Sequence, residues 1–409
     1  MMSKEKRRVP KLRFPGFTED WEQRKLSDVL IERNEQQVET REYPLMSFVQ
    51  GLGVTPKGER YDRSFLVLDQ SKKYKRTELG DFIYSSNNLE TGSIGINKTG
   101  KAVISPVYSI FQGVSIGDSQ FIGIMSLLPR FIAKMIRFRQ GVVYGQWRIH
   151  ETDFLDISVL IPSVDERTKI TQLILSIEEL ITLHQRKLDN LKLKKKALLQ
   201  KLFPKNGDRY PELRFPGFTD AWEQRKLDDI AKIKTGGGTP KTANPEYWSG
   251  NIPWIQSSDL VEGDIVHVNI NKFINNNALK NSAAKLISRD SIALVTRVGV
   301  GKVAVINQDF TTSQDFLSLS DFDGNDIKFL AYQLYRLMQE NAKVLQGTSI
   351  KGITKTELIE QSISIPSSGQ EQNLISNVLS KIDSIITLHQ RKLDHLQLQK
   401  KALLQQIFV

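Results

Sequence analysis

Two stretches of the chain carry apolar residues at alternating steps of four and three positions. Such steps align the apolar side chains along one side of a helix, and a row sustained over about five heptads is typical of a coiled coil. We therefore predict two long helices, each with one apolar seam. The seam consists of Ile170, Ile174, Ile177, Ile181, Leu188, Leu191, Leu198 and Leu202 in the first stretch and of Ile375, Leu379, Ile382, Ile386, Leu393, Leu396, Leu403 and Ile407 in the second.

Both predicted helices begin and continue alike. Ser163 with Glu166, and Ser368 with Glu371, form the S-x-x-E pattern of a capping box. Polar residues at seam positions lower the stability of a coiled coil but specify its register and its number of helices. We interpret the polar seam residues in this way rather than as metal ligands or catalytic groups: they are His184, Lys195, His389 and Lys400.

The chain repeats itself internally. Residues 10–29 and 211–230 are identical at fifteen of twenty positions. Residues 181–203 and 386–408 are identical at eighteen of twenty-three positions. Because repeats of this kind mark duplicated structural units, we expect the two halves of the chain to share one scaffold.

Between the repeated segments the two halves hardly resemble each other, so the order is shared, variable, shared, and then the same again. The join at residues 203–211 contains Pro, Asn-Gly and Pro, which are typical of a linker. We predict six segments: a shared arm at 1–24, a variable domain at 25–160, a shared helical region at 161–206, a second arm at 207–229, a second variable domain at 230–364, and a distal helical region at 365–409.

The variable domains combine short apolar runs with polar loops that contain glycine. Runs at Ser64–Leu68, Phe82–Tyr84, Ser291–Thr296 and Lys302–Ile306 are expected to be strands, and Ile327–Leu345 is expected to be a helix. Strands accompanied by some helix predict an α+β fold for each variable domain.

The two long helices are expected to pair within one chain. Similar helices that lead out of similar halves satisfy each other best across a pseudo-twofold axis, which favours an antiparallel coiled coil with one variable domain at each end. From Ile170 to Leu202 the helix spans roughly 50 Å at 1.5 Å per residue. That length corresponds to about 15 base pairs.

Composition narrows the class of partner. Lysine and arginine exceed aspartate and glutamate by 11 charges. A basic balance favours a polyanionic partner, although by itself it is equally consistent with a basic surface that binds nothing. The absence of cysteine excludes disulfides, thiolate nucleophiles and cysteine-based zinc sites, and the five histidines do not form a metal motif. Neither a signal peptide nor a membrane span is expected, so we predict a cytoplasmic protein.

Side chains that read base edges or contact phosphates occur in both variable domains. Each one by itself is better explained as a solvated polar residue or a phosphate contact than as a reader of a base edge. The first set is Lys72, Lys73, Lys75, Arg76, Asn87, Asn88, Lys98, Lys101, Gln146 and Arg148, and the second is Thr235, Thr239, Lys241, Ser257, Ser258, Arg297, Lys302, Gln314, Ser349 and Lys351.

Motifs of enzymes do not account for the chain. Gly299–Ala304 fits the G-x-G-x-x-A pattern, but a dinucleotide site needs a helix after the glycines, and here a second strand is expected. Asn244-Pro-Glu-Tyr247 departs at Glu246 from the N-P-P-Y motif of amino-methyltransferases. We therefore predict no catalytic residues, no metal site and no bound cofactor in this chain.

The whole chain resembles the specificity subunits of type I restriction–modification enzymes. The order of shared and variable regions is similar, as are the helices led in by Ile161-Pro-Ser163 and Ile365-Pro-Ser367. Thr235-Gly-Gly-Gly-Thr-Pro-Lys241 resembles a motif near the start of target recognition domains in that family. Gly347–Ile353 resembles a motif near their ends, and Gly145–Ile149 matches it more loosely.

The resemblance implies a function for each part. Each variable domain would be a target recognition domain that reads one half of a bipartite, asymmetric site on double-stranded DNA. The helices would set the length of the unread spacer and dock the methyltransferase (M) subunits, and restriction (R) subunits would join the assembly. S-adenosylmethionine, ATP and magnesium would belong to those partner subunits.

Two other interpretations remain open on sequence alone. The first is a non-catalytic two-headed coiled-coil adaptor that binds proteins, with an incidental basic charge. The second is an autonomous enzyme acting on DNA, which the missing catalytic motifs disfavour.

Overall fold

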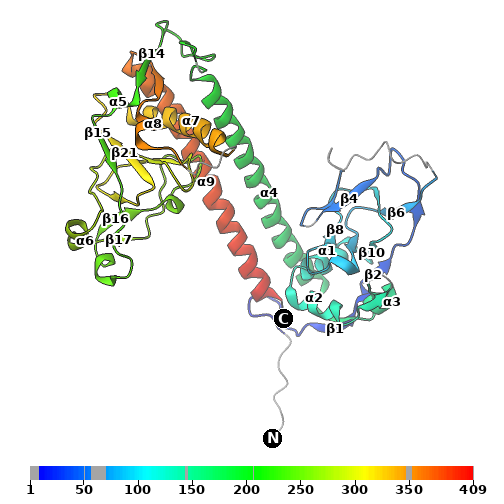
Figure 1. The fold of residues 1–409 in the computed structure, drawn as a ribbon. Coiled ribbons are helices and arrows are strands. Elements are labelled where there is room, and N and C mark those ends of the chain that lie inside the picture. The colour runs from blue at the N-terminus through cyan, green and yellow to red at the C-terminus, as the bar shows by residue number, and fades with distance from the viewer. Residues whose placement is uncertain are drawn as a thin grey trace. The chain divides into compact units, whose positions relative to one another are not determined.

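The computed structural model describes residues 9–49, 51–56, 71–142, 146–205, 207–346 and 352–408. The chain folds as two compact units (Figure 1). Unit 1 contains Met1–Leu183 and Leu393–Val409, and unit 2 contains His184–Lys392. Both long helices are divided between the units, so each unit combines one variable segment with the start of one helix and the end of the other.

The predicted long helices are confirmed as α4 (Val164–Lys201) and α9 (Gly369–Ile407). The capping box is confirmed in its serine half, because the hydroxyls of Ser163 and Ser368 accept the N–H groups of Glu166 and Glu371 at 3.4 Å. The two glutamate carboxylates bind arginines instead, as described below. Near the end of each helix the buried residue lies one position beyond the predicted seam: Leu199 and Leu404 are buried, whereas Leu198 and Leu403 are only partly buried. At this point each helix packs into the core of a unit.

Unit 1 holds its variable segment in a four-stranded antiparallel sheet of order β2-β10-β7-β8, flanked by a three-stranded sheet of order β3-β6-β9 and by smaller pairs. The strands are β1 (Glu22–Lys25), β2 (Leu30–Glu32), β3 (Gln36–Gln37), β4 (Met46–Val49), β5 (Gly53–Pro56), β6 (Tyr74–Thr77), β7 (Phe82–Tyr84), β8 (Ile94–Ile96), β9 (Ala102–Ile104), β10 (Ser109–Gly113), β11 (Gln140–Val142), β12 (Gln146–Arg148) and β13 (Ser158–Ile161). The helices are η1 (Leu26–Asp28), η4 (Ser86–Asn88), α1 (Ile116–Met125), α2 (Pro129–Ile136) and α3 (Glu151–Leu155).

Unit 2 holds the second variable segment in a four-stranded antiparallel sheet of order β15-β21-β18-β19 and a three-stranded sheet of order β17-β16-β20. The strands are β14 (Glu223–Lys226), β15 (Ile233–Gly236), β16 (Ile252–Ile255), β17 (Phe273–Ile274), β18 (Ser291–Val295), β19 (Val303–Ile306), β20 (Thr311–Thr312), β21 (Phe316–Ser320) and β22 (Ser362–Ile365). The helices are α5 (Leu227–Ile230), η6 (Pro245–Trp248), η7 (Ser257–Asp259), α6 (Asn276–Asn281), α7 (Ile327–Gln346) and α8 (Lys355–Ile359).

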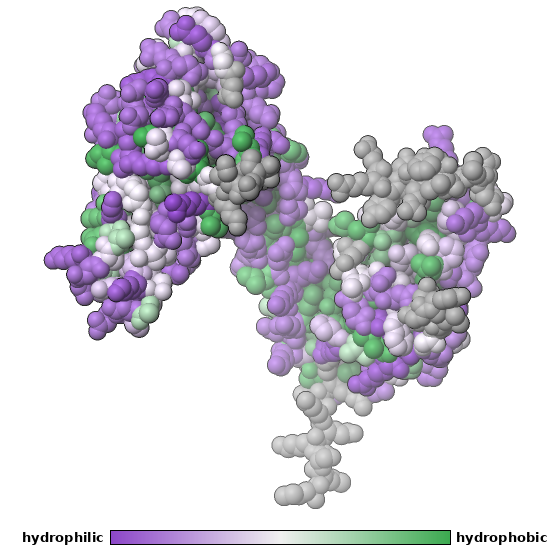
Figure 2. Space-filling model, in the orientation of Figure 1, coloured by the Kyte–Doolittle hydropathy of each residue, from purple (hydrophilic) through white to green (hydrophobic). Residues whose placement is uncertain are grey.

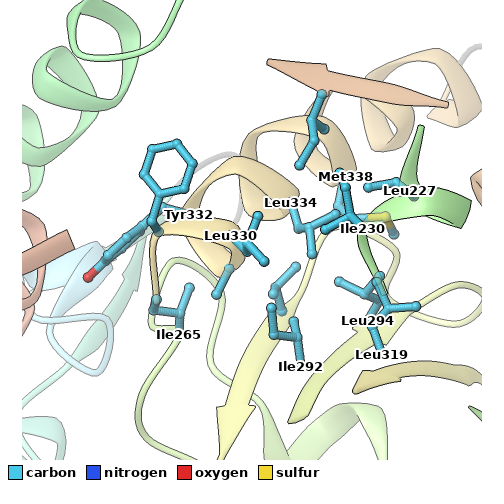
Figure 3. Packing of buried hydrophobic residues seen from close by; sticks show 14 of the residues in the cluster. Leu227, Ile230, Ile265, Ile292, Leu294, Leu319, Leu330, Tyr332, Leu334 and Met338 are labelled. Carbon is cyan, nitrogen blue, oxygen red and sulfur yellow. The ribbon is translucent and has the colours of Figure 1, made fainter. Parts of the chain in front are cut away.

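Strand β18 shows why a continuous apolar run becomes the centre of a sheet. Ile292 and Leu294 belong to the main core, whereas Ala293 and Val295 belong to a second cluster, so alternate residues bury opposite faces. Leu330, Leu334 and Met338 of α7 point toward the first of these faces (Figure 3). The helix that the sequence predicted at Ile327–Leu345 therefore covers the sheet.

Other predictions for the variable segments have mixed outcomes. The strands expected at 82–84, 291–296 and 302–306 are confirmed as β7, β18 and β19, and the hairpin between the last two excludes a dinucleotide turn. Together these elements confirm the α+β fold class. The strand expected at Ser64–Leu68 lies outside the described residues. In the described part of the chain, no helix combines the length and apolar character needed to cross a membrane.

The two long helices contact each other within each unit. In unit 2, His184 lies 2.8 Å from His389 between their Nδ1 atoms, and Lys195 forms an ion pair with Asp383. Toward higher residue numbers on α4, the facing residues on α9 therefore have lower residue numbers. In unit 1, Lys400 Nζ lies 2.7 Å from Glu178 Oε1.

Candidate nucleic-acid interface

The repeated arms attach in the same way in both units. The Arg13 guanidinium donates two hydrogen bonds of 2.7 Å to the Glu166 carboxylate at the start of α4. The Arg214 guanidinium binds the Glu371 carboxylate at the start of α9 through bonds of 2.8 and 2.9 Å. Both carboxylates are only 1% exposed, and paired bidentate bonds suit such burial. The shared segments therefore build one scaffold twice.

The join at residues 203–211 lies beside a backbone contact in unit 2. Unit 1 makes the equivalent contact between two pieces of chain that are far apart in the sequence. In unit 2, Leu213 N donates to Lys201 O at 2.8 Å, just beyond the join. In unit 1, the equivalent Leu12 N donates to Gln406 O at 3.0 Å, where the start of the described chain meets the end of α9 (Figure 1). The scaffold thus supports each variable segment by the end of one helix and the start of the other.

The two four-stranded sheets correspond strand for strand, although their sequences diverge. Order β2-β10-β7-β8 in unit 1 matches order β15-β21-β18-β19 in unit 2, with antiparallel pairing throughout. The loop between β7 and β8 therefore occupies the same place as the loop between β18 and β19. The first loop carries the exposed Asn87 and Asn88, and the second carries the exposed Arg297 and the half-buried Lys302.

A second segment adjoins this loop in each unit. In unit 1, Trp147 N donates to Asn87 Oδ1 at 2.6 Å and Ile149 N donates to Ser86 Oγ at 3.0 Å, so β12 lies beside the β7–β8 loop. In unit 2, Ile353 N donates to Thr296 O at 2.8 Å, beside the β18–β19 loop. We call these two places the loop edges of units 1 and 2.

Arg148 projects from the loop edge of unit 1. Its side chain is 56% exposed and lies 3.6 Å from Glu151, which also accepts a 2.9 Å bond from Ser109 Oγ. Burial would raise the pKa of Glu151, but hydrogen bonds from its own N–H and from Ser109, with the charges of Lys75 and Arg148, outweigh burial and lower that pKa. Glu151 is therefore anionic at neutral pH and steadies the exposed guanidinium.

At the loop edge of unit 2, several loops meet. Lys302 Nζ donates to Ser257 O at 2.9 Å, and Thr296 N donates to Asp315 O at 2.7 Å. Thr239 Oγ1 donates to Gln314 Oε1 at 2.5 Å. The structure therefore gathers seven candidates from four loops, of which all but Thr239, Ser257 and Lys302 are exposed: Thr239, Lys241, Ser257, Ser258, Arg297, Lys302 and Gln314.

Thr235 differs from these candidates because it lies within β15, opposite Ser318, and is half-buried. Ser349 and Lys351 lie outside the described residues, as does the side chain of Gln146. Their sequence-based assignment stays a prediction.

Most lysine and arginine candidates of unit 1 have other contacts. Lys75 is 8% exposed, Arg76 binds Glu35 at 2.7 Å and also pairs with Glu78, and Lys101 pairs with Glu42. Lys72 lies 5.7 Å from the centre of the Tyr74 ring, and Lys73 is exposed. An ion-paired side chain must give up its carboxylate to bind a phosphate, and a buried one cannot reach it. Lys75, Arg76 and Lys101 are therefore weakened as candidates, whereas Lys72 and Lys73 stay predictions.

Lys98 pairs with Glu178 of α4 and so joins the variable segment of unit 1 to its helix. Burial would raise the pKa of Glu178, but the charges and hydrogen bonds of Lys400 and Lys98 outweigh burial and lower it. Lys98 is therefore held in an ion pair that connects two parts of unit 1.

Sequence reasoning missed one prominent residue, Trp147, whose side chain is 48% exposed at the loop edge of unit 1. Tryptophan is usually buried, so only the neighbouring Arg148 hinted at a surface position. No group of three or more potential metal ligands occurs among the residues that the structure describes.

Comparison with known proteins relates the chain to one family. Residues 219–398 match the family described as Type I restriction modification DNA specificity domain. Over 171 residues the chain is 33% identical to the MjaIX specificity subunit of a type I restriction enzyme from Methanocaldococcus jannaschii. Over 170 residues it is 28% identical to the EcoR124I/EcoR124II specificity subunit from Escherichia coli. Each match covers 40% of this chain but only 38% and 41% of those proteins.

Two further likenesses extend over nearly the whole chain. A putative MjaX specificity subunit from Methanocaldococcus jannaschii is 22% identical over 420 residues, covering 94% of this chain and 92% of that protein. The crystal structure of the S subunit of a type I restriction-modification system from M. genitalium has a TM-score of 0.68 at 12% identity, covering 98% of this chain and 99% of that one. The second likeness concerns the fold.

Proposed function

Because the chain is related to the specificity subunits of type I restriction enzymes, we propose that it selects the DNA sequence on which such an enzyme acts. The observation that carries this proposal is the pair of loop edges. One sheet topology presents two different sets of side chains at the same place, as expected of two readers with different targets. Segments 25–160 and 230–364 are then target recognition domains, each reading one half of a bipartite, asymmetric site.

The helices α4 and α9 are proposed to form one antiparallel coiled coil that sets the spacer. Charge supports this orientation. The Lys195–Asp383 and Lys400–Glu178 pairs join opposite charges within units 2 and 1. If the helices ran parallel with equivalent residues side by side, Lys195 would face Lys400 and Glu178 would face Asp383, and like charges repel.

The shared segments 161–206 and 365–409, with the arms 1–24 and 207–229, are proposed to dock two copies of one partner. Exposed apolar residues recur at equivalent positions on the two helices, and hydrophobic residues stand among hydrophilic ones on the exposed surface (Figure 2). Repeated apolar positions on a solvent-facing helix are typical of protein contacts. The pairs are Leu180 with Ile385, Leu183 with Leu388, and Leu193 with Leu398.

The partners are proposed to be methyltransferase subunits, joined by restriction subunits, in the cytoplasm. S-adenosylmethionine, ATP and magnesium would act in those partners, and this chain would choose the site without carrying out chemistry. The absence of catalytic motifs from the sequence agrees with that division of labour.

The test is a map of methylated positions in DNA modified by the chain assembled with methyltransferase subunits. We expect one two-part asymmetric sequence with a fixed spacer, and binding that weakens steeply as salt rises. Replacing residues 25–160 by those of another specificity subunit should change one half of the sequence only. A chain that binds no DNA sequence selectively but retains protein partners would instead be an adaptor.

A further inference from the structure

Trp147 departs from the other tryptophans of unit 1 and unit 2. Trp21, Trp222 and Trp254 are 2%, 0% and 4% exposed and belong to cores, and Trp248 is half-buried against the cluster around Trp254, whereas Trp147 is 48% exposed. Leaving a large aromatic surface in water forgoes the hydrophobic stabilisation that burial would give. An exposed tryptophan beside the exposed polar side chains of Arg148 and Asn88 therefore suits a surface that becomes covered on binding.

The chain holds Trp147 in place without burying its ring. Strand β12 pairs with β11 so that Gly141 stands opposite Trp147. The ring atom Cζ3 lies 4.0 Å from the position that a Cβ of Gly141 would take, so the indole leans over the glycine. Asn87 Oδ1 accepts the Trp147 N–H at 2.6 Å and joins the hairpin to the β7–β8 loop. The side chain is thus presented by a small, doubly attached hairpin.

The neighbours of Trp147 suit a nucleic acid better than an apolar partner. Arg148 is 56% exposed, and Asn88 is exposed on the adjoining loop. An arginine and an amide beside an aromatic ring supply a charge for phosphate or guanine, a donor and acceptor for a base edge, and an apolar face.

We infer that Trp147 is a specificity-determining residue that makes an apolar contact with a base of the half-site read by unit 1. The inference rests on the proposed function and adds a residue to it. Aromatic side chains contact thymine methyl groups in the major groove, or insert between bases that a protein has unstacked. Either contact makes recognition depend on a nonpolar base surface that Arg148 and Asn88 do not read.

The experiment uses the full chain assembled with methyltransferase subunits and a library of half-site variants. Trp147→Ala should weaken binding to the preferred site about tenfold or more and broaden the sequence accepted in the first half-site only. Trp147→Phe should retain most of the wild-type selectivity, because an aromatic ring remains. The matched control is Val114→Ala, which truncates a side chain that is 61% exposed. Val114 follows the last residue of β10, whereas the β7–β8 loop lies at the other end of that strand, near Ser109.

Modified bases then identify the kind of contact. Uracil in place of thymine should weaken the wild type but not Trp147→Ala if the ring contacts a methyl group. 2-Aminopurine should brighten with the wild type and not with Trp147→Ala if the ring unstacks bases. Either result supports the inference.

Three outcomes separate this inference from the proposed function. If the wild type shows no sequence selectivity, the proposed function fails and the inference fails with it. If the wild type is selective but Trp147→Ala matches Val114→Ala in both half-sites, the inference alone is wrong. If Trp147→Ala weakens assembly with the methyltransferase subunits and the complexes that do form keep the wild-type selectivity, Trp147 is a protein contact and the inference is also wrong.

Discussion

Arg297 and Arg289 stand at opposite ends of one strand, β18, and both are exposed. Arg297 opens the loop edge of unit 2, where the candidate side chains gather, whereas Arg289 lies at the far end. The pair separates two effects that positive charge has on DNA binding. A general attraction for phosphates depends on both arginines alike, but reading a base depends on position.

Arg297→Ala is therefore expected to weaken selective binding by about 1–3 kcal/mol and to relax the second half-site. The measurement is binding across a library of half-site variants, at several salt concentrations. Arg289→Ala serves as the matched control and should lower affinity slightly and equally for all sequences. Equal effects of the two substitutions would show that the loop edge of unit 2 does not read bases.

His184 predicts how stability depends on pH. Its Nδ1 lies 2.8 Å from that of His389, so at least one ring must be neutral for one nitrogen to accept. Burial, and then the charges of His389, Lys392 and Lys187, lower the pKa of His184 below its usual 6.5. A lowered pKa in the folded state means that the unfolded chain binds the proton more readily.

Unit 2 should accordingly keep its full stability above about pH 6.5 and lose part of it as pH falls toward the lowered pKa. We expect the melting temperature to drop between pH 7.5 and 5.5, by on the order of a few degrees. The drop should shrink in His184→Gln, because glutamine cannot take up a proton. His395→Gln, at an exposed position, should leave the drop unchanged, and an unchanged drop in both variants would contradict the argument.

At the scale of elements, the buried pair between α4 and α9 in unit 2 has more than one contact. Lys195 pairs with Asp383, donates to Gly263 O at 2.6 Å, and lies 5.3 Å from the centre of the Tyr332 ring. Tyr332 donates its hydroxyl to Asp383 Oδ2 at 2.6 Å. Burial raises the pKa of Asp383, although Lys195 and Tyr332 oppose that rise. The carboxylate therefore depends on its partners to stay charged.

Removing the cation alone should be costly. Lys195→Met leaves Asp383 buried without its charge partner and is expected to destabilise the fold by about 3–5 kcal/mol. The double variant Lys195→Met with Asp383→Leu should recover much of that loss, since an apolar pair needs no partner charge. Urea denaturation measures both, with the exposed Lys192→Met as control. Additive losses in the double variant would refute the coupling.

At the scale of the whole molecule, the proposal is that one helical strut holds two readers at a set distance. His184 and His389 face each other and so mark matched positions on the two helices. Seven residues form two turns of a coiled coil and preserve its seam. An insertion of this size therefore lengthens each helix without rotating its apolar seam away from the partner helix.

Inserting seven residues after His184 and seven after His389 should lengthen the spacer by about 3 base pairs, since the helix grows by about 10.5 Å. Neither half-site should change. The measurement is the methylation map of the assembled complex. The control is a matched insertion of two residues, which rotates the apolar row of each helix by about 200° and so breaks the seam. A spacer of unchanged length in the seven-residue variant would remove the ruler from the proposal.

Much of the fold could be predicted because it depends on local pattern. Heptad spacing predicted α4 and α9, short apolar runs predicted β7, β18 and β19, and the helix expected at Ile327–Leu345 is α7. The candidate site was predicted less well. Lys75, Arg76 and Lys101 look like DNA contacts in sequence, but the fold buries the first and pairs the others with Glu35, Glu78 and Glu42. Those acids come close only after strands pair, which spacing along the chain does not reveal.

By itself the sequence determined the duplication, the two seams and the family resemblance, because each is a relation between residues that can be read along the chain. Only the tertiary structure decided that the loops after β7 and β18 are equivalent, since that depends on strand order within each sheet. Only the tertiary structure exposed Trp147, because exposure depends on what packs around a side chain. Pattern specifies elements, whereas the long-range pairing of those elements specifies which side chains meet a partner.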